Sequence, residues 1–137
     1  MKTSIAIVLG MISCAAIADC KTELPVTGVQ SLPACNAATQ VCLPPGKALQ
    51  DFMSKTKDDS SVLSLASHAS PWHAYDGDFR ILTIDDLAGK IRQFLAEHKT
   101  VKRVELLGSW TGVRPAANSP SIAERLSKTL QGFPVSG

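Results

Sequence analysis

The chain has 137 residues, of which 45% are hydrophobic and 19% are charged, and its formal net charge is +2 at pH 7. This length supports one domain with a hydrophobic core, and a second domain is not expected. Acidic and basic residues are nearly balanced and form no block of like charge, so no footprint for nucleic acid or for a membrane surface is present.

The first residues predict an export signal. Lys2 precedes an apolar run from Ile5 to Ile17, and Ala16-Ile17-Ala18 is a small-x-small cleavage site. We expect cleavage after Ala18 and a mature protein that is periplasmic or secreted. The run is only about a dozen residues, whereas a helix that spans a bilayer needs roughly 20, so the chain is not expected to span a membrane. An alternative is lipid anchoring at Cys14, since Met11-Ile12-Ser13-Cys14 loosely resembles a lipobox.

Three cysteines remain after this cleavage, Cys20, Cys35 and Cys42. An oxidising compartment favours pairing two of them. We predict a Cys35–Cys42 disulfide, whose short loop would contribute about 2.5 kcal/mol to stability through chain entropy. Cys20 would then be a free thiol or an intermolecular partner. The spacing does not suit zinc, so no metal site is predicted.

Residues 19–46 are rich in Pro, Thr, Ser and Ala without periodicity and predict an irregular, disulfide-containing segment. Residues 47–137 are expected to form one α/β domain. Its predicted helices cover Lys47–Lys55, Thr83–Glu97 and Ser121–Gln131, and its predicted strands cover Ser61–Ser67, Val101–Leu107 and Phe133–Val135.

The alternation of strands and helices predicts a small, mostly parallel sheet with flanking helices. Thr83 is a predicted helix cap, and Ser121-x-x-Glu124 is a capping box. The third strand is so short that the domain could be truncated, with Gly137 not its native end.

His68 and Ser109 are the candidate catalytic residues. His68 follows the first predicted strand of the domain and Ser109 follows the second. The carboxyl ends of parallel strands form the usual site of an open sheet, and neighbouring strands lie about 4.8 Å apart. If these strands are adjacent, the imidazole can reach the hydroxyl, as a base and its nucleophile require.

Two short segments support a family resemblance. The chain resembles the core of caspase-like cysteine peptidases, and most closely their bacterial toxin-processing branch, in Leu63–Pro71 and Val104–Gly112 with the helix between them. The segments Ile122–Leu126 and Phe133–Val135 continue the resemblance. The resemblance implies a caspase-like fold in which the base maps onto His68 and the nucleophile onto Ser109.

The sequence departs from that family at two positions. Ala69 occupies a position where glycine is usual, and Ser109 replaces the catalytic cysteine. A hydroxyl needs stronger activation than a thiol. Ser109 can equally be a turn residue, and His68 can equally be a hydrogen-bonded histidine under a loop.

Four further residues near this edge are candidates for binding. Trp72 and Trp110 could wall a pocket or close the core, Arg114 could bind an anion or be solvated, and His73 lies in a loop with Asp76-Gly77-Asp78. That acidic triplet is too short for a calcium loop and predicts a polar turn. No cofactor is predicted.

The leading functional hypothesis is a non-catalytic binding protein, a degenerate relative of caspase-like peptidases with a protein or peptide partner in the cell envelope. One alternative is a serine-type hydrolase or peptidase that uses a His68–Ser109 dyad. Another is an inhibitor or immunity factor that binds a secreted toxin.

Overall fold

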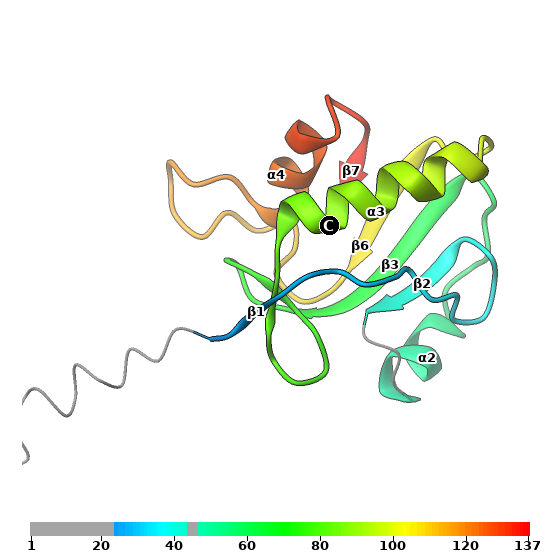
Figure 1. The fold of residues 1–137 in the computed structure, drawn as a ribbon, viewed down its shortest axis with the longest axis horizontal. Helices are drawn as coiled ribbons and strands as arrows, with labels where there is room; N and C mark the ends of the chain where they lie inside the picture. The colour runs from blue at the N-terminus through cyan, green and yellow to red at the C-terminus, as the bar shows by residue number, and fades with distance from the viewer. Residues whose placement is uncertain (1–23, 44–46) are drawn as a thin grey trace, which may run out of the picture.

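The computed structural model describes residues 24–43 and 47–137. The predicted export signal, Cys14 and Cys20 lie outside the described residues. The helices are α2 (Lys47–Met53), α3 (Ile84–Glu97) and α4 (Ile122–Thr129). The strands are β1 (Val26–Thr27), β2 (Gln40–Leu43), β3 (Val62–Ala69), β4 (Ala74–Tyr75), β5 (Ile81–Leu82), β6 (Arg103–Leu107) and β7 (Val135–Ser136). The fold is therefore mixed α/β (Figure 1).

Strand β3 is the centre of the sheet. It pairs in parallel with β6 along one edge, and its other edge pairs in parallel with β2 and then antiparallel with β4. Strand β7 adds in parallel to β6, while β5 pairs antiparallel with β4 and parallel with β1. All seven strands of the described chain belong to this one sheet.

The prediction of a mostly parallel sheet is wrong, because the sheet is mixed. Its antiparallel part is the β4–β5 hairpin, which lies in the segment between the first predicted strand of the domain and the long helix. Short hairpin strands are stabilised by pairing with their neighbours more than by their own composition, so this segment has no strong strand pattern.

The segment before residue 47 is more regular than its sequence indicates. Strand β2 is buried along its whole length and pairs with Ser64–Ser67 of β3. The predicted disulfide joins Cys35 to Cys42, with the two Cα atoms 5.6 Å apart, a separation that is usual for such a bridge. The segment therefore supplies an inner strand and a covalent link beside it.

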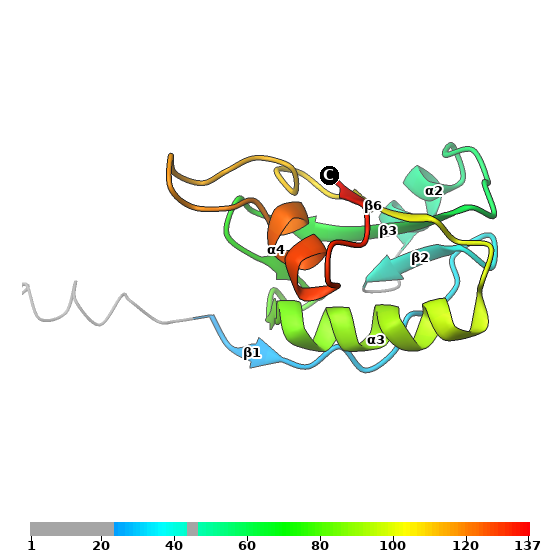
Figure 2. The same cartoon turned by 90° about the horizontal axis from the view of Figure 1, so that it is seen from above.

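The two faces of the sheet carry different side chains. Leu63 and Leu65 of β3 belong to the main core with α3 and α4, whereas Ala66 belongs to a smaller cluster with Cys42 and Met53. This alternation is the two-residue period of a strand. Figure 2 shows the result, with α2 on one side of the sheet and α3 on the other.

The predicted caps form at both longer helices. The Thr83 side chain accepts a hydrogen bond from the Asp86 N–H at the start of α3, and Ser121 and Glu124 form the complete capping box of α4. Helix α3 buries Leu87, Ala88 and Ile91 against the sheet, as its apolar stripe predicts.

The adjacency of the two main predicted strands is confirmed. Val62–Ala66 of β3 pairs in parallel with Arg103–Leu107 of β6. Both strands therefore end at the same edge of the sheet, where His68 and Ser109 follow the paired segments.

The turn after β6 depends on a glycine. A Cβ atom at position 108 would lie 2.7 Å from the Ser67 carbonyl oxygen and 3.1 Å from the Thr111 Cγ2. Backbone cannot move aside cheaply, so Gly108 allows the end of β6 to lie close to the end of β3.

We expect Gly108→Ala to lower the free energy of unfolding by about 1–3 kcal/mol through this overpacking. Gly89→Ala in α3 is the matched control, because a Cβ there would contact nothing within 4 Å. That change should stabilise the protein by about 0.5–1 kcal/mol. Urea denaturation measures both, and equal stability of the two variants would contradict the role assigned to Gly108.

Candidate functional site

A groove with a volume of about 560 Å³ opens where β3 and β6 end. Helix α2, the end of β3, the β4–β5 hairpin and the end of β6 with the turn after it all contribute to its lining. The lining residues are Leu49, Phe52, Ser67, His68, Ala69, Tyr75, Phe79, Leu106, Leu107, Gly108 and Ser109. Most of them are apolar, and the polar groups are few, as in many binding pockets for small ligands and side chains.

His68 lies near the end of β3 and is exposed to solvent. Its ring stacks on the ring of Phe79, with centroids 6.0 Å apart and planes inclined by 27°. The Tyr75 ring lies 6.5 Å from that of Phe79. These three rings form the aromatic wall of the groove, the name used below for His68, Tyr75 and Phe79.

The β4–β5 turn places Phe79 in that wall. The Asp76 carboxylate accepts hydrogen bonds from the N–H groups of Asp78 and Arg80, both at 2.9 Å. Phe79 takes a left-handed backbone conformation with φ of 56°, which is uncommon for a large side chain. The predicted polar turn is therefore confirmed, and it positions an aromatic ring.

Ser109 is exposed on the turn after β6 and lines the same groove as His68. The buried Thr111 side chain fixes this turn, because its hydroxyl lies 3.2 Å from the Leu106 carbonyl and 3.0 Å from the Gly108 carbonyl. The chain thus brings both candidate catalytic residues to one place.

The two side chains do not form an assembled catalytic dyad. Among the residues that the structure describes, no hydrogen bond joins the His68 imidazole to the Ser109 hydroxyl, and no carboxylate accepts a hydrogen bond from His68. A hydroxyl nucleophile needs a base that a third group orients. The His68 ring instead packs against a phenyl ring.

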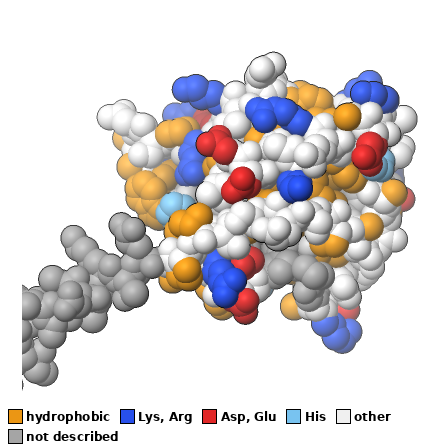
Figure 3. Space-filling model, viewed as in Figure 1, with side chains coloured by type: hydrophobic (Ala, Val, Ile, Leu, Met, Phe, Trp, Pro, Cys, Tyr) orange, Lys and Arg blue, Asp and Glu red, His pale blue; other side chains and the backbone are white. Residues whose placement is uncertain are grey.

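The tryptophans lie near the groove without lining it. Trp72, in the β3–β4 turn, is 50% exposed, and Trp110, with φ of 69°, is 59% exposed. Figure 3 shows hydrophobic side chains gathered at the left rim of the molecule. The exposed fractions of Trp72 and Trp110 place both rings on the surface, and neither closes the core.

His73 is half-buried in the β3–β4 turn, beside Tyr75, at a ring distance of 6.3 Å. Burial lowers the pKa of the His73 imidazole, and the positive charge of Arg125 lowers it further. Both effects favour the neutral form of the ring.

Arg114 is engaged by the start of α4. Its guanidinium pairs with both carboxylate oxygens of Glu124, and the Glu124 carboxylate also accepts from the Ser121 N–H. The Arg114 hydrogen bonds and then the Ser121 N–H lower the pKa of Glu124 to about 2. This pair caps a helix, and an anion would have to compete with Glu124 for Arg114.

Of the residues that line the groove, the sequence indicated only His68 and Ser109 as site residues, and it missed the large side chains of Leu49, Phe52, Tyr75 and Phe79. Leu49 and Phe52 belong to the predicted apolar stripe of the first helix, yet Phe52 is 50% exposed while Met53 is fully buried. The signal that could have marked Phe79 is its place next to an Asp-Gly-Asp turn, where a large apolar residue is unusual.

Comparison of the chain with protein-family models, with curated proteins and with solved structures returns no match. Across residues 24–43 and 47–137, no helix is long and apolar enough to cross a bilayer. Within the same ranges, no group of three His, Cys, Asp or Glu side chains could hold a metal ion.

The Glu124 carboxylate gives a pH prediction. Its folded pKa lies below the ordinary value of 4.5, so its ion pair stabilises the folded protein above about pH 4.5 and loses this effect as the pH falls toward 2. Glu124→Gln keeps the capping box but removes the charge. We expect the variant to melt at a lower temperature than the parent at pH 7, with the difference disappearing near pH 2. A difference that does not change with pH would contradict the assignment.

Proposed function

We propose that this protein is an exported, non-catalytic binding protein whose groove takes an apolar side chain, preferably an aromatic one, from a peptide or protein partner. The observation that carries the proposal is the groove itself, which is lined by Leu49 and Phe52 of α2 and by the aromatic wall. Its volume of about 560 Å³ is in the range of ordinary ligand pockets.

Exposed rings at the mouth of the groove support a partner of this kind. Phe52 is 50% exposed and Phe79 is 60% exposed, and they reach the groove from two different parts of the chain, α2 and the β4–β5 turn. An aromatic side chain between them would bury apolar area on both of its faces, and aromatic pairs add about 0.5–1.5 kcal/mol beyond that area. His68 and Ser109 would supply hydrogen bonds to the backbone of the partner.

Two observations support the absence of catalysis. The imidazole of His68 packs on Phe79, and within the described residues no hydrogen bond joins it to Ser109 or to a carboxylate. Where the caspase-like family that the chain resembles has a catalytic cysteine, this chain has a serine. We therefore propose that the groove corresponds to the substrate cleft of that fold and has kept binding without chemistry.

The Cys35–Cys42 disulfide supports the proposed extracytoplasmic location, because such bridges persist in oxidising compartments and are rare in the cytosol.

The binding proposal is tested by NMR titration with N-acetyl-L-phenylalanine amide. We expect chemical-shift changes confined to the groove residues and a Kd on the order of millimolar, as suits a ligand of this size. N-acetyl-L-serine amide is the matched ligand and should not bind measurably. Phe52→Ala and Phe79→Ala should each raise the Kd about fivefold to tenfold.

Trp72→Ala is the control variant, since Trp72 is equally exposed but lies outside the groove. Its Kd should equal that of the parent. Shift changes centred on Trp72 or Trp110, or none at all, would refute the proposed role of the groove.

Labelling with a fluorophosphonate probe distinguishes binding from hydrolysis. We expect Ser109 to remain unlabelled, because no base among the described residues accepts a hydrogen bond from its hydroxyl. Labelling of Ser109 that His68→Ala abolishes would establish a working dyad and would favour the serine hydrolase instead.

A further inference from the structure

The loop closed by the disulfide packs beneath α2. Cys42 is 1% exposed and lies on β2 opposite Ala66 of β3. Together with Met53 these residues form the small core cluster on this face of the sheet, and Cys35 and Leu49 pack against it. Leu49 is also a wall residue of the groove. The two cysteines and the groove residue Leu49 therefore all belong to, or pack against, the same small core cluster.

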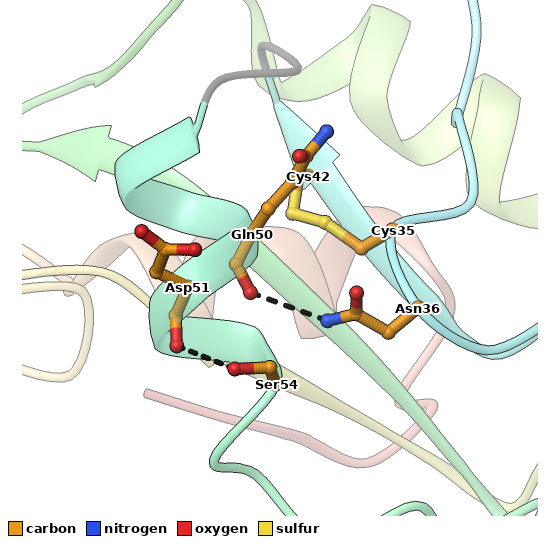
Figure 4. The surroundings of a disulfide bond; sticks show 6 residues. All are labelled: Cys35, Asn36, Cys42, Gln50, Asp51 and Ser54. Atoms are coloured by element: carbon orange, nitrogen blue, oxygen red, sulfur yellow. Dashed lines mark hydrogen bonds between the residues drawn. A yellow bond between two sulfur atoms is a disulfide. The ribbon is translucent and has the colours of Figure 1, made fainter.

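Side chains of the same loop hold the α2 segment by hydrogen bonds. The Asn36 amide donates to the Gln50 carbonyl at 3.2 Å, as Figure 4 shows. Beyond the helix, the Gln40 amide donates to the Thr56 carbonyl at 3.1 Å. The disulfide loop thus acts as a bracket that joins α2 and the turn after it to the sheet.

Helix α2 is short and mostly exposed. It has seven residues, of which only Met53 is buried. A helix this short is not stable in water without tertiary contacts. Its position, and with it the position of Leu49 and Phe52, depends on the bracket and on the contacts of Met53.

We propose that the Cys35–Cys42 disulfide is a redox switch for the groove: oxidation locks the α2 wall in place, and reduction by a dithiol releases it and abolishes binding. This inference rests on the proposed binding function of the groove. The observations behind the switch are the contacts between the disulfide loop and the α2 segment, because α2 also supplies Leu49 and Phe52 to the groove.

The reduction is an ordinary thiol–disulfide exchange. A thiolate of the dithiol attacks the sulfur of Cys35, a residue that is only half-buried, and forms a mixed disulfide, while the Cys42 thiolate leaves and takes a proton. The second thiol of the reductant then displaces Cys35. Two protein thiols form, and the reductant is oxidised to its own disulfide.

Met53 gives a direct readout of α2. The other two of the three methionines are Met1 and Met11, so Met53 is the single methionine of a chain cleaved after Ala18. We would label the methionine methyl group with carbon-13 and follow its NMR signal and its broadening by a soluble paramagnetic agent, with and without dithiothreitol.

We expect the Met53 signal to be sharp and protected from broadening in the oxidised protein. On reduction it should move to the position of a solvent-exposed methionine and broaden at least tenfold more. The methyl signals of Ile91, in the α3 core, should not change. In the same samples the Kd for N-acetyl-L-phenylalanine amide should rise at least tenfold.

Two variants complete the test. Cys35→Ala/Cys42→Ala should show an exposed Met53 whether or not dithiothreitol is present. Asn36→Ala keeps the disulfide but loses one hydrogen bond of the bracket, and should respond to reduction as the parent does.

The outcomes separate the two proposals. An unchanged Met53 signal after complete reduction, a change that includes Ile91, or equal affinity of both redox states for the amide would overturn the switch. If the amide fails to bind even the oxidised protein, the proposed function fails, and the Met53 signal alone then decides whether the disulfide controls α2.

Discussion

The burial of β3 on both faces and along both edges is the constraint on which the rest of the structure depends. Val62 to Ser67 are all buried. Such a strand must pair its backbone groups on both sides, since unpaired polar groups are costly away from water. Strands β2 and β6 supply these pairing partners for β3. One of them precedes α2 in the chain and the other follows α3, so two distant segments lie on either side of β3. The site exists because β3 continues past both partners and carries His68 beyond them.

Local signals in the sequence predict much of this architecture. Thr83 and Ser121 cap the helices they were expected to cap, because a cap needs only residues within one turn. Strand β2 and the β4–β5 hairpin were not expected, because their strand character comes from pairing with distant residues. The shared edge of His68 and Ser109 followed from parallel pairing, whereas the packing of His68 on Phe79 depends on a hairpin that local patterns do not indicate.

The groove forms because the helices cover the two faces of the sheet to different extents. Among the described residues, the long α3 and the capped α4 cover one face, and the seven-residue α2 lies on the other. A short helix covers little area, so the ends of β3 and β6 on that face meet solvent between α2 and the hairpin. The face of the sheet under α3 and α4 thus forms the main core. The face under α2 leaves apolar surface open to solvent, beside the Cys35–Cys42 disulfide.

The outermost strands of the sheet, β1 and β7, have two residues each. A long bare edge presents a row of unpaired N–H and C=O groups that can template another chain and lead to fibrils. Two residues present too few such groups for this, and the loop before β2 covers part of that strand through the Ala34–Val41 bridge. Within the described sheet, such short outer strands therefore offer little backbone for lateral pairing with a second chain.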